Sequence, residues 1–71
     1  MEPYQERVIA EAAELTDKFN KLTKFTLAGV FETLPVAAQF RIRLKVNVMR
    51  MYLITLQERI DEFKDQDNDS T

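Results

Sequence analysis

Five side chains that donate hydrogen bonds are gathered in the middle of the chain, where no acidic residue occurs from 33 to 57. They are Arg41, Arg43, Lys45, Asn47 and Arg50. Arginine suits phosphate because its planar guanidinium group donates two hydrogen bonds at once. We interpret the set as candidate anion ligands. The alternative interpretation is that its bases pair with Glu and Asp of a neighbouring helix or chain.

A second candidate lies near the N-terminus, where Tyr4 and Arg7 stand at the predicted start of a helix. An aromatic ring beside an arginine could stack on a nucleobase and hold a phosphate. The alternative is a ring that only covers the end of the helical pair. Both interpretations stay open at the level of the sequence.

Catalytic residues are much harder to find. The chain has no His and no Cys, and it contains no Gly-rich loop or nucleophile motif. The carboxylate pairs Glu11/Glu14 and Glu58/Glu62 are spaced for one helix face, but they have no partner base. We interpret them as solubilising charges. The sequence therefore predicts a protein that is not an enzyme, with no cofactor and no metal site.

With 71 residues the chain forms one domain at most. A domain this small draws only about 3–5 kcal/mol from one core, and without Cys no disulfide can add to it. Oligomerisation is the remaining common means of stabilisation. The start "MEPYQER" has no apolar region, and the longest apolar stretch, "MYLITL", is too short to cross a bilayer. We expect a cytoplasmic protein without a membrane partner.

The candidate residues must be positioned by helices. Apolar residues recur at steps of 4, 3, 4 and 3, which predicts a helix over about 3–25; they are Val8, Ala12, Leu15, Phe19 and Leu22. Gly29 is a candidate C-terminal cap in the turn that follows. Phe31 and Leu34 should tuck under this turn, and Pro35 marks a new start.

The segment "QFRIRLKVNV", residues 39–48, alternates like a half-buried strand. A second stripe nevertheless runs through it with helical spacing and holds its register for 22 residues, which is too long for a strand. The stripe consists of Ile42, Val46, Met49, Leu53, Leu56, Ile60 and Phe63. The sequence therefore predicts a helix over about 35–64, and a strand is the weaker alternative.

The alternation has a further meaning on a helix, because positions two apart lie about 200° apart around its axis. It creates a back stripe on the opposite side from the first, made of Phe40, Leu44, Val48 and Met51. A two-helix hairpin covers only one side of each helix, so the back stripe should face another chain. We predict an all-α antiparallel hairpin, domain 1–64, that assembles into a symmetric homo-oligomeric bundle. The acidic segment 65–71 is predicted to be a disordered tail.

The chain also resembles a known group of proteins through "YQERVIAEAAELTDKFNKL", "FETLP" and "QFRIRLKVNVMRMYLITLQERI", over about residues 3–63. The matching positions are Tyr4, Gln5, Arg7, Val8, Glu14, Leu15, Lys18, Phe31, Leu34, Pro35, Met49, Tyr52, Leu56, Arg59 and Ile60. This pattern is similar to short phage-encoded helical hairpins related to the anti-CBASS and anti-Thoeris sponge proteins. The chain lacks the Gly-Tyr-Arg and Leu-Met-Asn-x-Ile-Lys segments of the anti-CBASS sponges, so their ligand residues have no counterparts here.

The resemblance implies a symmetric oligomer, hexamers being among the forms in that group, which sequesters a cyclic nucleotide signal of bacterial immunity without cleaving it. We therefore predict a phage anti-defence protein that acts in the host cytoplasm. The rival hypothesis is a small oligomeric adaptor or inhibitor that binds a host protein through the apolar and basic faces of the second helix. Nucleic-acid binding fits less well, because the basic set is small and the net charge is −2.

Overall fold

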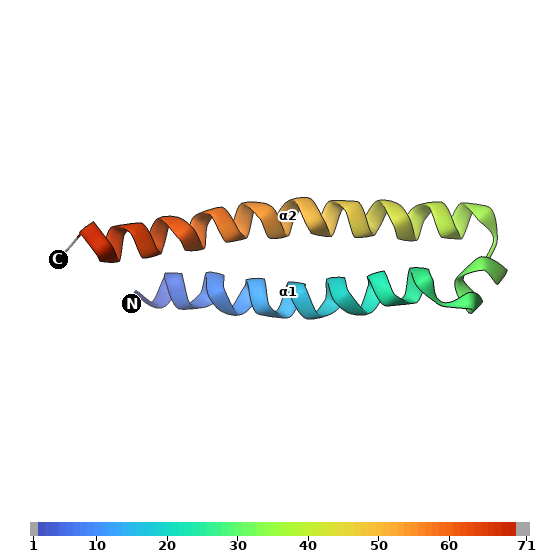
Figure 1. Cartoon of the computed structure of the whole chain (residues 1–71), viewed down its shortest axis with the longest axis horizontal. Coiled ribbons are helices and arrows are strands. Elements are labelled where there is room, and N and C mark those ends of the chain that lie inside the picture. The colour runs from blue at the N-terminus through green and yellow to red at the C-terminus, as the bar shows by residue number, and fades with distance from the viewer. Residues whose placement is uncertain (1, 70–71) are drawn as a thin grey trace.

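The protein is a long hairpin of two antiparallel helices (Figure 1). The computed structural model describes residues 2–69, with the side chains of residues 2–65. Helix α1 (Pro3–Leu27) leads into the short 3-10 helix η1 (Gly29–Thr33), and helix α2 (Val36–Asp69) returns alongside α1. The molecule measures 55 × 16 × 15 Å. The predicted all-α two-helix hairpin is confirmed.

The observed helices are longer than the predicted ones. Helix α1 starts at Pro3, as predicted, and continues to Leu27. Helix α2 continues to Asp69, beyond the predicted end at 64. No Gly or Pro follows Pro35, so the sequence has no residue that would stop the helix early. Residues 70 and 71 lie outside the described residues, and the separate acidic tail stays a prediction.

The core is built where the two predicted apolar stripes meet. Val8 from α1 packs with Leu56, Ile60 and Phe63 from α2, and Ala12 adds to this cluster. Leu56 is only 2% exposed. The alternating segment is helical throughout, and within it Val46 is buried, as the longer helical period requires. The helical spacing of the apolar side chains, and not the local alternation, therefore determines the secondary structure of this segment.

Phe31 closes the turn end of the hairpin. Its side chain is 0% exposed, and its ring meets the ring of Phe25 edge-on, with centroids 5.9 Å apart. The side-chain amide of Gln39 donates to the carbonyl oxygen of Leu34 at 2.8 Å, which ties the start of α2 to the turn. The prediction that Phe31 and Leu34 tuck under the turn is confirmed, Leu34 being half-buried.

The prediction of Gly29 as a helix cap is wrong. Helix α1 ends at Leu27, and its C-cap residue is Ala28, which is extended, with φ −77° and ψ 145°. The N–H of Ala28 donates to the carbonyl of Phe25 at 3.1 Å. Gly29 does not adopt a positive φ, which a glycine cap of the left-handed type needs. The chain instead turns by starting a 3-10 helix at this residue.

Replacing Gly29 with alanine should therefore stabilise the protein. The backbone suits any L-residue, and an added Cβ meets no atom within 4 Å. Alanine restricts the unfolded chain, so we expect the free energy of unfolding to rise by about 0.4–1 kcal/mol. Urea denaturation followed by circular dichroism measures this change. Ala28→Gly is the matched control and should shift stability in the opposite direction; a destabilised Gly29→Ala would contradict the description of the turn.

Candidate functional site

The basic set of α2 lies along the half of this helix that begins at the turn, and all five side chains are exposed. Two of its members rest on aromatic rings of the same hairpin. The guanidinium carbon of Arg43 lies 5.1 Å from the ring centre of Phe31, and that of Arg50 lies 5.9 Å from the ring centre of Phe19. Arg50 also donates to the side-chain oxygen of Asn47 at 3.0 Å. These contacts hold the guanidinium groups of Arg43 and Arg50 against the hairpin, and both side chains stay exposed to solvent.

Among the side chains of residues 2–65, no acidic group forms an ion pair with a base of α2. The ion pair that forms among them joins Lys21 to Asp17, one turn apart on α1, at 2.9 Å. The alternative in which the basic set pairs with acids of α1 is therefore not realised inside the hairpin. Pairing with acids of another chain stays a prediction.

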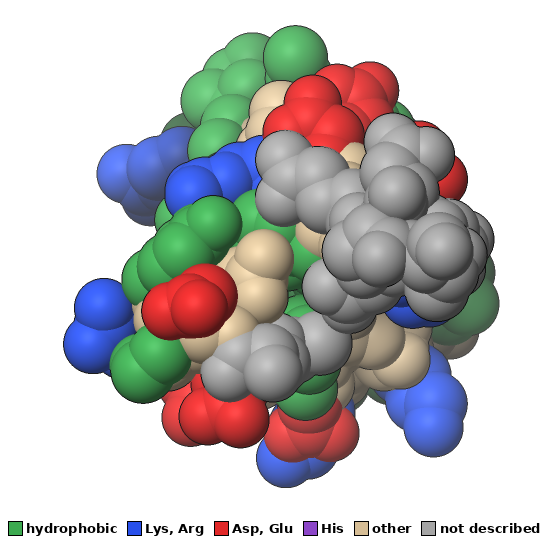
Figure 2. Space-filling view, turned by 90° about the vertical axis from the view of Figure 1, so that its left-hand side faces the viewer, with side chains coloured by type: hydrophobic (Ala, Val, Ile, Leu, Met, Phe, Trp, Pro, Cys, Tyr) green, Lys and Arg blue, Asp and Glu red, His purple; other side chains and the backbone are tan. Residues whose placement is uncertain are grey.

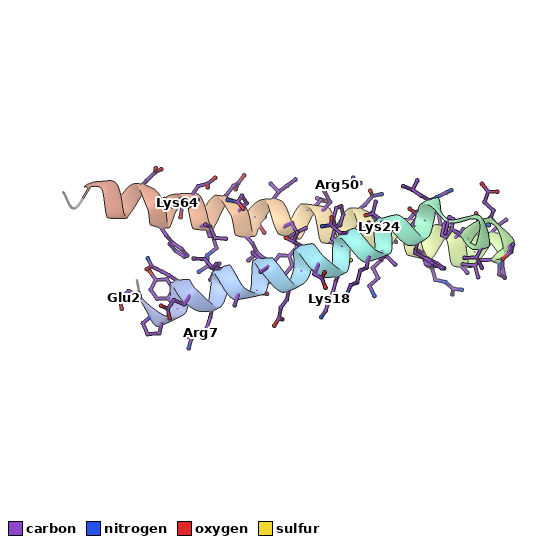
Figure 3. All side chains as sticks on the ribbon, turned by 60° about the horizontal axis from the view of Figure 1, so that its bottom comes forward. Glu2, Arg7, Lys18, Lys24, Arg50 and Lys64 are labelled. Carbon is purple, nitrogen blue, oxygen red and sulfur yellow. The ribbon has the colours of Figure 1, made fainter. Side chains whose placement is uncertain are left out.

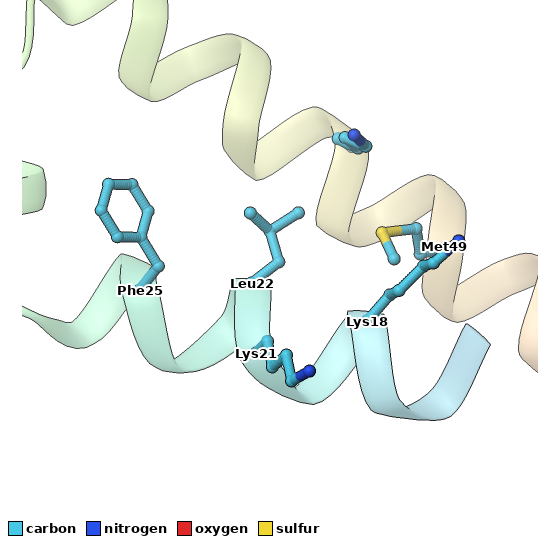
Figure 4. Close-up of a pocket in the computed structure, with 6 residues that line it drawn as sticks. Lys18, Lys21, Leu22, Phe25 and Met49 are labelled. Atoms are coloured by element: carbon cyan, nitrogen blue, oxygen red, sulfur yellow. The ribbon is translucent and has the colours of Figure 1, made fainter. Parts of the chain in front are cut away.

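A groove between the helices brings together charges that are distant in the sequence (Figure 4). It has a volume of about 350 Å³. It is lined by Lys18, Lys21, Leu22, Phe25, Lys45 and Met49. Figure 4 shows the side chains of Phe25 and Leu22 directed from α1 toward α2, with Met49 approaching from the other side. Three lysines thus line the groove around an apolar floor. The ammonium group of Lys21 is paired with Asp17, and Lys45 is the member of the predicted set that lines the groove.

Lys18 and Lys21 are candidate ligands that the sequence analysis did not propose. They lie three residues apart on α1 and line the same groove as Lys45. Their basic type was visible in the sequence, but the register of α1 against α2 was not. The structure shows that register, in which both lysines line one groove with Lys45.

The back stripe of α2 is exposed in the protomer. The exposed fractions are 66% for Phe40, 52% for Leu44, 58% for Val48 and 67% for Met51. Figure 2, which views the molecule from the end where the termini lie, shows hydrophobic side chains at the surface on the upper side, where α2 runs, with basic side chains next to them. The protomer therefore leaves one face of α2 without an apolar partner.

The sequence model of one protein family, Sequestin, matches residues 2–62. The chain belongs to the Sequestin family. The match covers α1, η1 and most of α2, and so includes all the candidate residues of the Sequestin hairpin described above. The family name indicates a protein that sequesters a ligand. Neither the curated proteins nor the solved structures yielded a match.

The two N-terminal candidates of this Sequestin chain lie at the opposite end from the basic set. The ring of Tyr4 meets that of Phe63 edge-on, with centroids 5.6 Å apart, whereas Arg43 rests on Phe31 at the turn. Figure 3 shows Arg7 projecting outward from α1 near its start. Tyr4 thus has the contact expected of a ring that covers the open end. One protomer does not bring it together with the basic set, and its role toward a ligand stays a prediction.

A second hollow of the Sequestin hairpin, of about 260 Å³, lies beside Lys18 and is lined by Glu11, Glu14, Leu15 and Tyr52 as well. The hydroxyl of Tyr52 donates a hydrogen bond to the carboxylate of Glu11 and so links α2 to α1. This bond, with some burial and the negative charge of Glu11, raises the pKa of Tyr52 above its ordinary value of 10.0.

Over residues 2–69, neither helix is long and apolar enough to span a membrane.

The Tyr52–Glu11 bond predicts a measurable titration. In a Tyr4→Phe background Tyr52 is the remaining tyrosine, so absorbance of the tyrosinate reports it alone. We expect its pKa to exceed 10.0 and to fall when Glu11 is replaced with glutamine. Because the folded-state pKa is raised, the stabilisation from this bond should be complete below the ordinary pKa and should be lost as pH rises through the folded-state pKa.

Glu14→Gln is the matched control for this titration, because Glu14 lines the same hollow but does not bond to Tyr52. It should leave the midpoint of Tyr52 close to that of the parent. An equal fall of the midpoint in both variants would show that general negative charge, and not the hydrogen bond, causes the shift.

Proposed function

We propose that this protein is a phage anti-defence protein that binds and sequesters a cyclic (oligo)nucleotide immune signal between protomers, without cleaving it. The observation that carries the proposal is the groove in which Lys18 of α1 and Lys45 of α2 line an apolar floor. Membership of the Sequestin family supports sequestration as the activity. The nucleotide identity of the ligand and the role in immune evasion rest on the resemblance to phage sponge proteins.

The groove offers the two kinds of surface that a nucleotide needs. The ring of Phe25 and the side chains of Leu22 and Met49 give an apolar floor on which a nucleobase can lie. The ammonium groups of Lys18 and Lys45 approach from different helices and can meet phosphate oxygens. These lining groups supply cations and apolar surface, which fits a ligand that is retained unchanged.

The size of the groove favours a site shared between protomers. About 350 Å³ lies near the lower limit of small-ligand pockets, which span roughly 300–1,000 Å³. It accommodates part of a cyclic dinucleotide, and the remainder needs another surface. A second protomer that covers the exposed back stripe of α2 would supply it, because Arg41 and Lys45 border that stripe. Homo-oligomerisation is thus part of the proposed function.

Calorimetry tests the proposal directly. The purified protein is titrated with cyclic dinucleotides, cyclic trinucleotides and cyclic ADP-ribose isomers, and each mixture is then analysed chromatographically. We expect saturable heat with at least one ligand, and recovery of that ligand unchanged after the protein is denatured. Heat with none of them would refute the sponge function, and a recovered cleavage product would refute sequestration as the mechanism.

The exposed back stripe also favours a second candidate function, in which the protein caps a host protein and the bases steer the encounter. This adaptor would bind no nucleotide from the panel. It would retain a defined host protein in a pull-down, and Leu44→Glu should abolish that retention. The two candidate functions therefore give opposite results in the calorimeter.

A further inference from the structure

The back stripe is symmetric about its own midpoint. Leu44 and Val48 lie two residues on either side of Val46, and Phe40 and Met51 lie six and five residues away from it. A two-fold contact requires that residue i meets residue j while j meets i. Two antiparallel copies of α2 that cross near Val46 satisfy this condition, since each Leu44 then faces a Val48.

We propose that a second copy of this chain covers the back stripe in this antiparallel register, and that binding of a polyvalent anion and self-association are therefore coupled. The proposal rests on the homo-oligomer of the proposed function and adds its orientation, its register and its regulation. In this arrangement each Phe40 meets a Met51, and contacts between sulfur and an aromatic ring are favourable.

The register also decides where the charges gather. In an antiparallel two-fold pair, each flank of one helix borders the same flank of the other. Arg41 and Lys45 flank the back stripe on one side, with Arg43 and Arg50 on the other. Each side of the interface therefore holds four positive charges, two from each copy, and the bases of α2 have no acidic partner within the described protomer. An anion with several charges fits between them.

A competing register slides the copies until the basic half of α2 meets the acidic half of its partner. Arg43 would then face Asp61, whereas Lys45 would face Arg59 on its own flank. Exposed ion pairs contribute little to stability, because water and salt screen them. Covering a large apolar side chain contributes more than an exposed ion pair does, and four partly exposed ones are available on each copy. Apolar burial therefore selects the register centred on Val46.

The size of this contact makes it responsive to a ligand. In that register α2 overlaps its partner from about 36 to 56, which is roughly 31 Å of helix at 1.5 Å per residue. With a hairpin about 16 Å wide, each copy covers about 500 Å². That is less than the ~800 Å² per partner of a standard stable interface. Repulsion between the two sets of bases weakens the contact further, so neutralisation by an anion shifts the equilibrium toward the pair.

Sedimentation equilibrium over a range of protein concentrations tests the coupling. We expect the dissociation constant of the pair to fall on the order of tenfold between low salt and about 0.5 M NaCl, because salt screens the like charges. Inorganic tripolyphosphate, at constant ionic strength, should lower it further. The competing register gives the opposite sign, since its ion pairs weaken as salt rises.

Two variants and a control make the result specific. Arg43→Gln with Arg50→Gln should tighten the pair at low salt and reduce its response to NaCl. Leu44→Glu should abolish association, whereas Leu27→Glu, at a residue that is 82% exposed on α1, should leave it intact. Circular dichroism of each variant establishes that the hairpin is folded.

Three outcomes would overturn the inference: a dissociation constant that rises with NaCl, one that ignores both NaCl and tripolyphosphate, or a wild-type chain that stays monomeric throughout. The nucleotide panel in the calorimeter is independent of these outcomes. Ligand binding by a monomer, or by a pair that salt weakens, would remove the coupled assembly and leave the sequestering activity in place.

Discussion

Replacing Phe31 with alanine is expected to unfold most of the protein at room temperature. The side chain is 0% exposed and is the largest one that is fully buried. Its ring meets the ring of Phe25 edge-on, and the guanidinium group of Arg43 lies over it. Removing a buried phenylalanine side chain costs about 3–5 kcal/mol. A domain of this size has only about 3–5 kcal/mol in total, so this single change removes nearly all of it.

Thermal denaturation followed by circular dichroism at 222 nm measures this effect at several protein concentrations. Val30→Ala is the matched control, because it neighbours Phe31 in η1 but is 56% exposed. It should melt close to the wild type. A Phe31→Ala protein that retains a cooperative transition at the wild-type temperature would show that the turn is not anchored by this ring.

The second large effect concerns the groove. We expect Lys45→Gln and Lys18→Gln each to weaken binding of the nucleotide identified by calorimetry on the order of tenfold or more, the typical loss for a charged hydrogen bond. Both side chains line the groove, and they come from different helices. The double variant should lose affinity further. Folding should change little, because both residues are exposed.

Lys24→Gln is the control for charge alone. It removes the same charge from an exposed residue of α1 that does not line the groove. It should leave affinity within a factor of about two, since charge at the surface acts through a screened interaction. Equal losses in all three single variants would indicate non-specific attraction. Full affinity in the double variant would place the ligand elsewhere, with Arg43 and Arg50 as the next candidates.

The helices were predictable from the sequence because their apolar spacing is long and regular. The strand-like segment 39–48 could be assigned only by extending the count to Phe63, since five alternating positions fit both periods. The failure at Gly29 has a definite cause. Glycine after a helix usually marks a left-handed cap. Here the side chain of Phe31 is fully buried at the turn, and Gly29 belongs to the 3-10 helix that contains Phe31.

The candidate site was only partly predictable. The sequence revealed the basic set of α2, because the stretch 33–57 contains basic residues and no acidic ones. It could not reveal that Lys45 and Lys18 line one groove from opposite helices, nor that Arg43 lies over Phe31. Such contacts depend on the relative translation of two helices, and a sequence pattern with a period of about one turn fits several translations equally well.

The distance between the two ends of the hairpin allows its self-association to be measured by energy transfer between fluorophores. Glu2 and Asp69, the first and last described residues, lie at one end of a 55 Å hairpin, and the basic half of α2 extends to the other end (Figure 1). A fluorophore attached near the start of α1 therefore stays clear of the groove. In an antiparallel pair, two such dyes would lie at opposite ends and transfer less energy than in a parallel pair, which would bring them together.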